Sequence, residues 1–184
     1  MVDVIAATFG FVDWALPFIQ IWGYLGLFVV EAIGSMSIFF PVPAFAINFI
    51  LGGTAGFNPW MVGIVAGLGS AIGELTGYLL GRGGRELLNS KKQKIFRKAE
   101  RWIEKHGIFI IIVVFAATPL PFDVVGILAG MLRYDVRRFF LATLTGKIIS
   151  GLLLAWAGFY SINWILYAFN PDTPQNVTGY FLYR

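Results

Sequence analysis

The chain has no cysteine and only one histidine, His106, among its 184 residues. Disulfide bonds, thiolate catalysis and cysteine-ligated metals are therefore excluded, and a histidine metal site cannot be built. The sequence also lacks the G-x-S-x-G, G-x-x-x-x-G-K-S/T and H-E-x-x-H motifs. We therefore expect a protein that is not an enzyme and that uses neither a metal nor another cofactor.

Charge is scarce and unevenly placed. Only 13% of the residues are charged, whereas soluble domains contain about a quarter, and 58% are hydrophobic. The first 81 residues contain no lysine or arginine, and nine of the 14 cations lie between Arg82 and Lys105. This segregation is typical of a membrane protein. Because the high pI comes mainly from one loop, no nucleic-acid partner is predicted.

The apolar runs divide a single domain into five parts. They are an N-terminal apolar helix (1–22), a first repeat (23–81) with a hairpin about Pro41–Pro43 and a transmembrane helix at 60–81, a basic amphipathic linker (82–107), a second repeat (108–168) with a hairpin about Pro119–Pro121 and a transmembrane helix at 139–166, and a polar tail (169–184). Without a cation in 1–22, charge does not decide whether that helix spans the bilayer or lies at its surface.

The basic linker sets the expected orientation in the cell membrane. The positive-inside rule places 82–107 in the cytoplasm and the C-terminal tail outside. Residues 91–105 alternate apolar and basic positions at helical spacing, as in an amphipathic helix on an anionic membrane surface. A solvated linker helix is the alternative interpretation.

Segment 108–132 predicts a re-entrant hairpin rather than a span. A straight helix would carry Arg133 and the cations after it to the outside, against the rule. Pro119 and Pro121 also interrupt the middle of the segment. If 108–118 descends about 16 Å and the chain then returns, both ends stay on the cytoplasmic side. Irregular backbone at this depth is tolerated only inside protein or beside a wet cavity.

The two halves of the chain repeat one pattern with opposite orientation. An offset of 78 residues superposes the two proline pairs and aligns Gly52 with Gly130. Because 60–81 ends at the cytoplasm and 139–166 starts there, the repeats are inverted, as in secondary transporters. The predicted fold is therefore an all-α integral membrane protein, an inverted repeat of a re-entrant helical hairpin plus a transmembrane helix, joined by an amphipathic helix.

These features resemble the DedA family, also called the SNARE-associated Golgi or VTT-domain family, over roughly residues 20–160. The residues that carry the resemblance are Glu31, Pro41, Val42, Pro43, Gly52, Gly69, Gly73, Gly77, Tyr78, Gly81, Arg82, Pro119, Gly130, Met131, Arg137, Arg138, Phe139, Gly146 and Gly158. The resemblance implies two facing re-entrant hairpins and the movement of phosphate-headed lipids across a bilayer. Bacterial members are implicated in returning undecaprenyl phosphate, and eukaryotic relatives in phospholipid scrambling.

The chain departs from the family pattern near both proline motifs. The family often has an acid just after the first motif, where this chain has Ala44 and Phe45. Bacterial members commonly have arginines around the second motif, where this chain has Ala116 and Phe122. These departures weaken the transfer of a bacterial substrate and indicate a divergent member, such as an archaeal one.

Two carboxylates are candidates for the transport pathway, because an ionisable group inside a membrane is costly. Glu31 precedes the first proline motif. It is interpreted as a proton-coupling or headgroup-contacting group, or alternatively as a hydrated interfacial acid. Asp123 follows the second motif and either caps the returning helix or faces a wet cavity. In the cavity interpretation, protons move with the lipid through both acids.

Two further charges fall at equal depth on the two predicted spans. Glu74 lies about 12 Å below the cytoplasmic end of 60–81, and Lys147 about 14 Å below that of 139–166. We expect these side chains to form a salt bridge. The pair either fixes the register of the two helices or presents Lys147 to a lipid phosphate.

A glycine stripe and a basic mouth complete the candidate residues. The stripe consists of Gly69, Gly73, Gly77 and Gly81, which should pack against another helix of the chain or form a homo-oligomer interface. The basic mouth consists of Arg133, Arg137 and Arg138, which should recruit anionic headgroups or only set the topology.

The expected partners are membrane lipids with anionic or phosphate headgroups. The leading function is a flippase or scramblase that moves phospholipid or polyprenyl-phosphate headgroups, with or without protons. One alternative is an ion- or proton-coupled small-solute transporter on the same scaffold. Another is a structural scaffold protein that binds partners through the glycine stripe.

Overall fold

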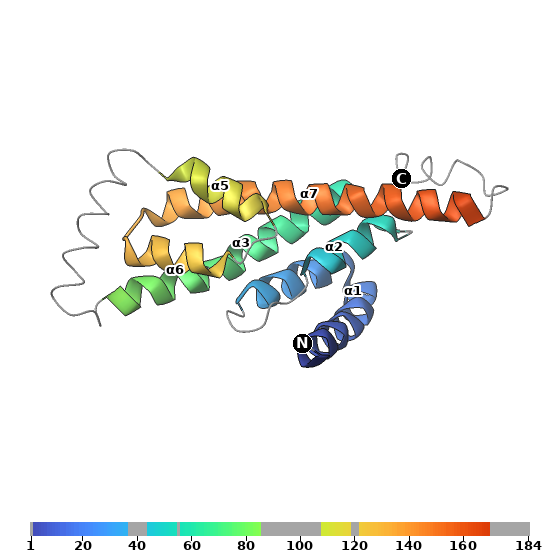
Figure 1. Ribbon diagram of the computed structural model, residues 1–184, viewed down its shortest axis with the longest axis horizontal. Coiled ribbons are helices and arrows are strands. Elements are labelled where there is room, and N and C mark those ends of the chain that lie inside the picture. The colour runs from blue at the N-terminus through green and yellow to red at the C-terminus, as the bar shows by residue number, and fades with distance from the viewer. Residues whose placement is uncertain (1, 37–43, 55, 86–107, 119–121, 170–184) are drawn as a thin grey trace.

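The computed structural model describes residues 2–36, 44–54, 56–85, 108–118 and 122–169. Their regular structure is helical throughout, which confirms the all-α prediction for these ranges (Figure 1). The helices are α1 (Val2–Met36), α2 (Ala44–Gly53), α3 (Pro59–Gly84), α5 (Phe109–Ala117), α6 (Asp123–Met131) and α7 (Val136–Phe169). The predicted linker helix, Pro41, Pro43, Pro119, Pro121 and residues 170–184 lie outside the described ranges.

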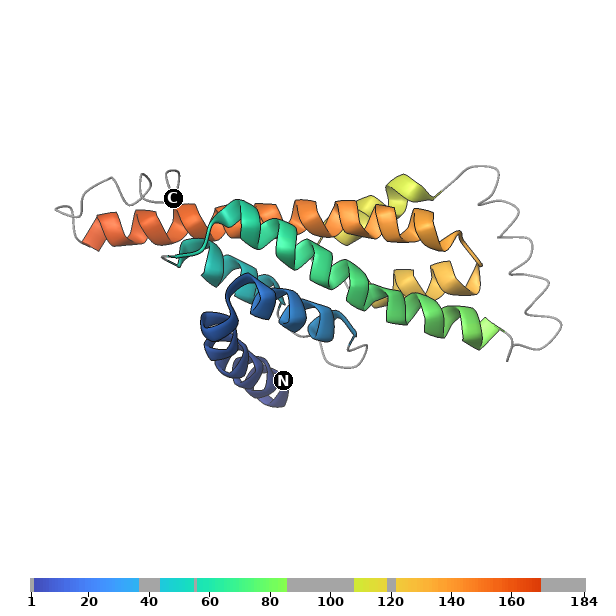
Figure 2. The ribbon, with the colours of Figure 1, turned by 180° about the vertical axis from the view of Figure 1, so that it is seen from behind.

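The two long helices α3 and α7 run side by side along the length of the molecule, as Figures 1 and 2 show from opposite sides. Glycines allow their backbones to approach closely. A Cβ atom at Gly67 would lie 2.7 Å from the backbone of Ile148, and one at Gly151 would lie 2.7 Å from the carbonyl oxygen of Gly63. The other helices of the bundle pack on this central pair, α3 and α7.

In each half of the chain, one of the other helices packs on α3 and the next packs on α7, or the reverse. In the first half of the chain, α1 packs on α3 and α2 packs on α7. In the second half, α5 packs on α7 and α6 packs on α3. Each pair of helices therefore contacts both the long helix of its own half and the long helix of the other half.

Helix α1 is broken at Gly23, whose dihedral angles (φ 60°, ψ −135°) are not helical. Positive φ costs glycine little because it has no Cβ. The part of α1 before this residue runs in a different direction from the part after it (Figures 1 and 2), although its Ala15 and Ile19 are fully buried in the core. Residues 24–36 pack along α3, and the Tyr24 hydroxyl accepts a 2.7 Å hydrogen bond from the backbone of Asn58.

Local sequence explains where both long helices begin. Asn58 caps α3 through a 2.9 Å hydrogen bond from the backbone of Trp60 to its side-chain oxygen, and Pro59 fills the first helical position. Asp135 precedes α7 and accepts a 2.9 Å hydrogen bond from the backbone of Arg138. Both caps satisfy backbone donors that lack a partner within the helix.

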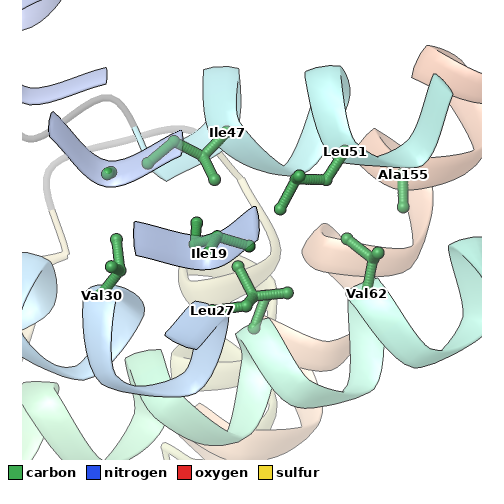
Figure 3. Packing of buried hydrophobic residues seen from close by; sticks show 9 residues of the cluster. Ile19, Leu27, Val30, Ile47, Leu51, Val62 and Ala155 are labelled. Carbon is green, nitrogen blue, oxygen red and sulfur yellow. The ribbon is translucent and has the colours of Figure 1, made fainter. Parts of the chain in front are cut away.

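The apolar core consists of two separate clusters. The first joins α1, α2, α3 and α7 and includes Leu27, Ile47, Leu51 and Val62 (Figure 3). The second joins α3, α5, α6 and α7 and centres on aromatic residues such as Phe139, which stacks on Tyr78. The two clusters hold opposite ends of the bundle together.

Large apolar side chains also cover the outside of the bundle. They include Leu79, Leu80, Ile110, Val114 and Leu153, which are all exposed. A soluble surface rarely carries so much contiguous apolar area, whereas a lipid-facing surface must. Three described helices are long and apolar enough to cross a bilayer, namely Gly10–Met36, Pro59–Gly84 and Val136–Ser161. The first of these contains the break at Gly23.

Candidate functional site: a polar layer in the middle of the bundle

One stripe of α3 passes from one apolar cluster through polar residues to the other cluster. Val62, Ala66, Ser70, Glu74 and Tyr78 follow one another at intervals of four residues, and all five are buried. The first two belong to the first cluster and Tyr78 belongs to the second. Ser70 and Glu74 therefore lie between the two clusters, near the middle of a helix about 39 Å long.

Glu31 is fully enclosed on the α1 side of this level, with 1% of its surface exposed. The Ser70 hydroxyl donates a 2.6 Å hydrogen bond to its Oε2 atom. The Asn48 side chain, from α2, also interacts with the carboxyl group. Glu31 thus joins α1, α2 and α3 through polar contacts in an otherwise apolar environment.

Glu74 and Lys147 connect the two long helices. The Lys147 Nζ atom lies 2.7 Å from Glu74 Oε1, so the structure brings together the two charges that the sequence places at equal depth. The same ammonium group lies 5.3 Å from the centre of the Phe122 ring, which suits a cation–π contact. Lys147 is therefore held between a carboxylate of α3 and the aromatic ring that precedes α6.

Asp123 is the first residue of α6, and Phe122 takes the N-cap position without a side-chain hydrogen bond. The capping interpretation of Asp123 therefore differs from the structure. A carboxylate in the first turn still interacts favourably with the free backbone donors there. Its charge also interacts with Lys147 and with Glu74.

Lys147 is the electrostatic centre of the group. Its charge acts on Glu31, Glu74 and Asp123, which come from three different helices. The structure therefore brings all four predicted pathway residues into one neighbourhood. We call this neighbourhood the central polar layer, and its members are Glu31, Asn48, Ser70, Glu74, Asp123, Thr143 and Lys147.

Several oxygens of the central polar layer lack a hydrogen-bond partner among the described residues. They are Glu31 Oε1, Asn48 Oδ1, Glu74 Oε2 and Thr143 Oγ1. Each is buried, and a buried polar atom without a partner is unfavourable by about 1–3 kcal/mol. These oxygens are therefore free to accept hydrogen bonds from other polar groups.

Two helix ends from different halves of the chain meet beside this layer. A Cβ atom at Gly73 would lie 2.6 Å from the Cβ of Ser35, in the last turn of α1. A Cβ atom at Gly77, one turn further along α3, would lie 3.8 Å from the carbonyl oxygen of Asp123. The end of α1 and the start of α6 thus contact α3 at positions about one helical turn apart.

The glycine stripe packs against other helices of the same chain. Gly69 and Gly73 face the backbone of α1, whereas Gly77 and Gly81 face α6. One continuous stripe of α3 thus receives one helix from each half of the chain. Arg133, Arg137 and Arg138 are exposed between α6 and the first turn of α7, and Arg133 has a positive φ of 50°.

Side chains of α3 tie its end to the turn between α6 and α7. The Tyr78 hydroxyl donates a 2.5 Å hydrogen bond to the carbonyl oxygen of Tyr134. Arg82 donates to the Tyr78 oxygen at 3.2 Å, and Arg85 donates to the Met131 carbonyl at 3.0 Å. Burial raises the pKa of the Tyr134 phenol, which therefore stays neutral at physiological pH.

Sequence reasoning missed the neutral members of the layer. Asn48 is the only polar side chain between 44 and 53, and that isolation was an available signal. Ser70 precedes Glu74 by one helical turn, which was another. Thr143 precedes Lys147 by one turn and is completely buried. A hydroxyl or amide is common in an apolar helix, so none of these residues is conspicuous in the sequence.

Comparisons with known proteins agree with the predicted family. A family model described as the VTT domain matches residues 40–160 of the chain, which confirms the resemblance drawn from the sequence. No solved structure matches the chain.

Curated relatives come from bacteria, archaea and plants. Membrane protein YhjE of Bacillus subtilis is 28% identical over 116 residues, which cover 61% of this chain and 56% of YhjE. Protein MJ0201 of Methanocaldococcus jannaschii is 27% identical over 140 residues, which cover 76% of this chain and 86% of that protein. Vacuole membrane protein KMS1 of Arabidopsis thaliana is 33% identical over 106 residues, 47% of this chain and 26% of KMS1. The matched region thus spans little more than half of YhjE and about a quarter of KMS1.

Proposed function

The chain is a membrane protein that belongs to the VTT-domain (DedA) family, and from this premise we propose that it moves lipids with phosphate-containing headgroups across the bilayer, as a flippase or scramblase. The tails would stay in the surrounding lipid while the headgroup passes through the protein. The observation that carries this proposal is the central polar layer, which lies midway along α3 between two apolar clusters.

Helix lengths support re-entrant hairpins in both halves. Helices α2, α5 and α6 have 10, 9 and 9 residues, or about 14–15 Å each. The hydrocarbon core of a bilayer is about 30 Å thick, so none of the three can cross it alone. Residues 24–36 of α1, beyond the break at Gly23, are also too short at about 20 Å. The two hairpins would enter from opposite sides and meet at the central polar layer.

Lys147 is the group best placed to meet a lipid phosphate. It is the only cation of the described central polar layer, and 21% of its side chain remains exposed. Phosphate oxygens could share the ammonium with Glu74, since an ammonium has three donors. On the cytoplasmic side, the basic mouth of Arg133, Arg137 and Arg138 would attract anionic headgroups towards this path. This orientation places the linker 82–107 in the cytoplasm and the tail outside.

A second function is an ion- or proton-coupled small-solute transporter, and the charge count favours it. The described central polar layer contains three carboxylates and one cation. Such a layer would attract a small cation as readily as it would admit a phosphate. A scaffold function remains a third alternative, although the glycine stripe proposed for it contacts α1 and α6 of the same chain.

Redistribution of a fluorescent phospholipid in proteoliposomes tests the lipid function. Wild-type protein should move the lipid between leaflets, and Lys147→Met should move it far more slowly. Because that change leaves Glu74 without its counterion, the double variant Glu74→Gln/Lys147→Met serves as the folding control. If the double variant folds and moves lipid at the wild-type rate, a phosphate-binding Lys147 is rejected. A solute-flux assay then separates a small-solute transporter from a scaffold.

A further inference from the structure

Glu31 differs from Glu74 in its lack of a direct cationic partner. Glu74 is paired with Lys147 at 2.7 Å. Glu31 instead contacts the neutral side chains of Ser70 and Asn48, and Lys147 acts on it only through its field. An ionised carboxylate buried without a counterion is unfavourable by several kcal/mol. The native protein must therefore neutralise this group in another way.

The atoms around Glu31 form a set of oxygen ligands. Glu31 contributes a carboxylate from α1, Asn48 an amide oxygen from α2, and Ser70 a hydroxyl oxygen from α3. All three side chains are more than nine-tenths buried. Glu31 Oε1 and Asn48 Oδ1 have no hydrogen-bond partner among the described residues.

This set is short of positive charge. Of the described helices packed on α1, α3 adds Glu74 and α2 adds no charged residue. The other charged members of the layer are Lys147 of α7 and Asp123 of α6. With every acid ionised, the layer would carry three negative charges and one positive charge. Carboxylate, amide and hydroxyl oxygens are ligands for hard cations.

We propose that Glu31, Asn48 and Ser70 form a binding site for a monovalent alkali cation, Na⁺ or K⁺, in the middle of the bundle. Na⁺ is the expected ion, and it would compete at this site with a proton. The cation would neutralise Glu31 and give both unpaired oxygens a partner at once. Because the three ligands come from three helices, occupancy would hold the first hairpin against α3. The inference deepens the proposed transport function by naming a coupling ion.

Thermal unfolding of the purified full chain in detergent tests the site. At pH 8 and constant ionic strength, NaCl should raise the melting temperature by about 3 °C or more relative to choline chloride. KCl should give the same effect or a smaller one. At pH 5.5 the difference should shrink, because a proton then occupies Glu31. Equal melting temperatures in NaCl, KCl and choline chloride would show that the salt acts only through ionic strength, or that water alone fills the site. Either result would overturn the proposed cation site.

Substitutions of the proposed ligands test whether they cause the difference in melting temperature between NaCl and choline chloride. Glu31→Gln and Asn48→Leu should each abolish the difference between NaCl and choline chloride. Asp123→Asn is the matched control, since it removes a carboxylate from the same layer but keeps all three proposed ligands. If Asp123→Asn abolishes the difference while Asn48→Leu retains it, the assignment to Asn48 is rejected.

A direct measurement of Na⁺ binding to the wild-type protein does not depend on whether the variants fold. Radioactive ²²Na⁺ should bind the wild-type protein, and unlabelled NaCl but not choline chloride should displace it. Absence of binding overturns the inference whatever the variants do. Lipid redistribution separates this inference from the proposed function. Redistribution without Na⁺ binding would reject the site alone, and Na⁺ binding without redistribution would reject the lipid function alone.

Discussion

Glu74 Oε1 and Lys147 Nζ lie 2.7 Å apart and join the two long helices α3 and α7, which run antiparallel (Figure 1). Glu74 is 5% exposed at its side chain and Lys147 is 21% exposed. The pair is thus largely withdrawn from solvent. Its two possible roles, helix register and phosphate binding, can be separated by experiment.

Removing one member of this pair should destabilise the protein strongly. Glu74→Gln leaves the ammonium of Lys147 buried without a counterion, which should lower the free energy of unfolding by about 3–5 kcal/mol. The exchange Glu74→Lys/Lys147→Glu restores opposite charges and should recover most of this loss. Thermal unfolding in detergent measures both. If the exchanged protein is stable but moves no lipid, the position of the lysine matters for transport, whereas full transport would assign the pair to helix register.

The identification of this pair shows what could be predicted from the sequence. A charge inside an apolar run stands out against its neighbours, so the sequence alone indicates Glu31, Glu74, Asp123 and Lys147 as candidates. Counting residues from the basic ends of two spans then gave equal depths for Glu74 and Lys147. Neutral partners such as Asn48 carry no comparable signal, because one amide in an apolar helix is common.

Other features depend on tertiary contacts that periodicity cannot supply. The glycine stripe predicted close packing, but nothing in its spacing divides it between α1 and α6. The helix break at Gly23 is likewise hidden among 22 glycines. The cap of α6 depends on how the chain enters the helix, which the order Pro121-Phe122-Asp123 does not fix.

Close backbone packing predicts a large effect of one methyl group. A Cβ atom at Gly158 would overlap the carbonyl group of Phe49, where α7 crosses α2. Gly158→Ala should therefore lower the free energy of unfolding by about 1–3 kcal/mol through overpacking. Gly83→Ala is the matched control, because a Cβ there meets nothing within 4 Å. Unfolding in detergent should show a loss only for Gly158→Ala, and equal stability of both variants would refute the contact.

The hydrogen bond from Tyr78 to Tyr134 should hold α3 to the turn after α6. Tyr78→Phe removes the donor and leaves the Tyr134 carbonyl without it, and also leaves Arg82 without its 3.2 Å acceptor. We expect a loss of about 1–2 kcal/mol in the free energy of unfolding. The exposed Tyr160 provides the control, since Tyr160→Phe should change stability by less than about 0.5 kcal/mol. A Tyr78→Phe protein as stable as wild type would contradict the inferred role of this bond.

Proton coupling predicts a link between lipid movement and a pH gradient. In proteoliposomes, a gradient should change the redistribution rate of the wild-type protein. Glu31→Gln and Asp123→Asn should each reduce that response, because the amide no longer binds and releases a proton. The measurement compares each variant with and without the gradient. Rates that ignore both the gradient and the two substitutions would rule out coupling through these carboxylates.

The absence of cysteine makes the predicted hairpin in the second half directly testable, because any introduced thiol is the only one in the chain. Gly83 and Arg137 are both exposed, near the C-terminal end of α3 and in the first turn of α7. If 108–132 is re-entrant, Gly83→Cys and Arg137→Cys react with a membrane-impermeant maleimide from the same, cytoplasmic side. Gln175→Cys, in the tail, should react only from outside. If Arg137→Cys instead reacts only from outside, 108–132 crosses the bilayer, the two halves are no longer inverted, and the lipid path between facing hairpins must be abandoned.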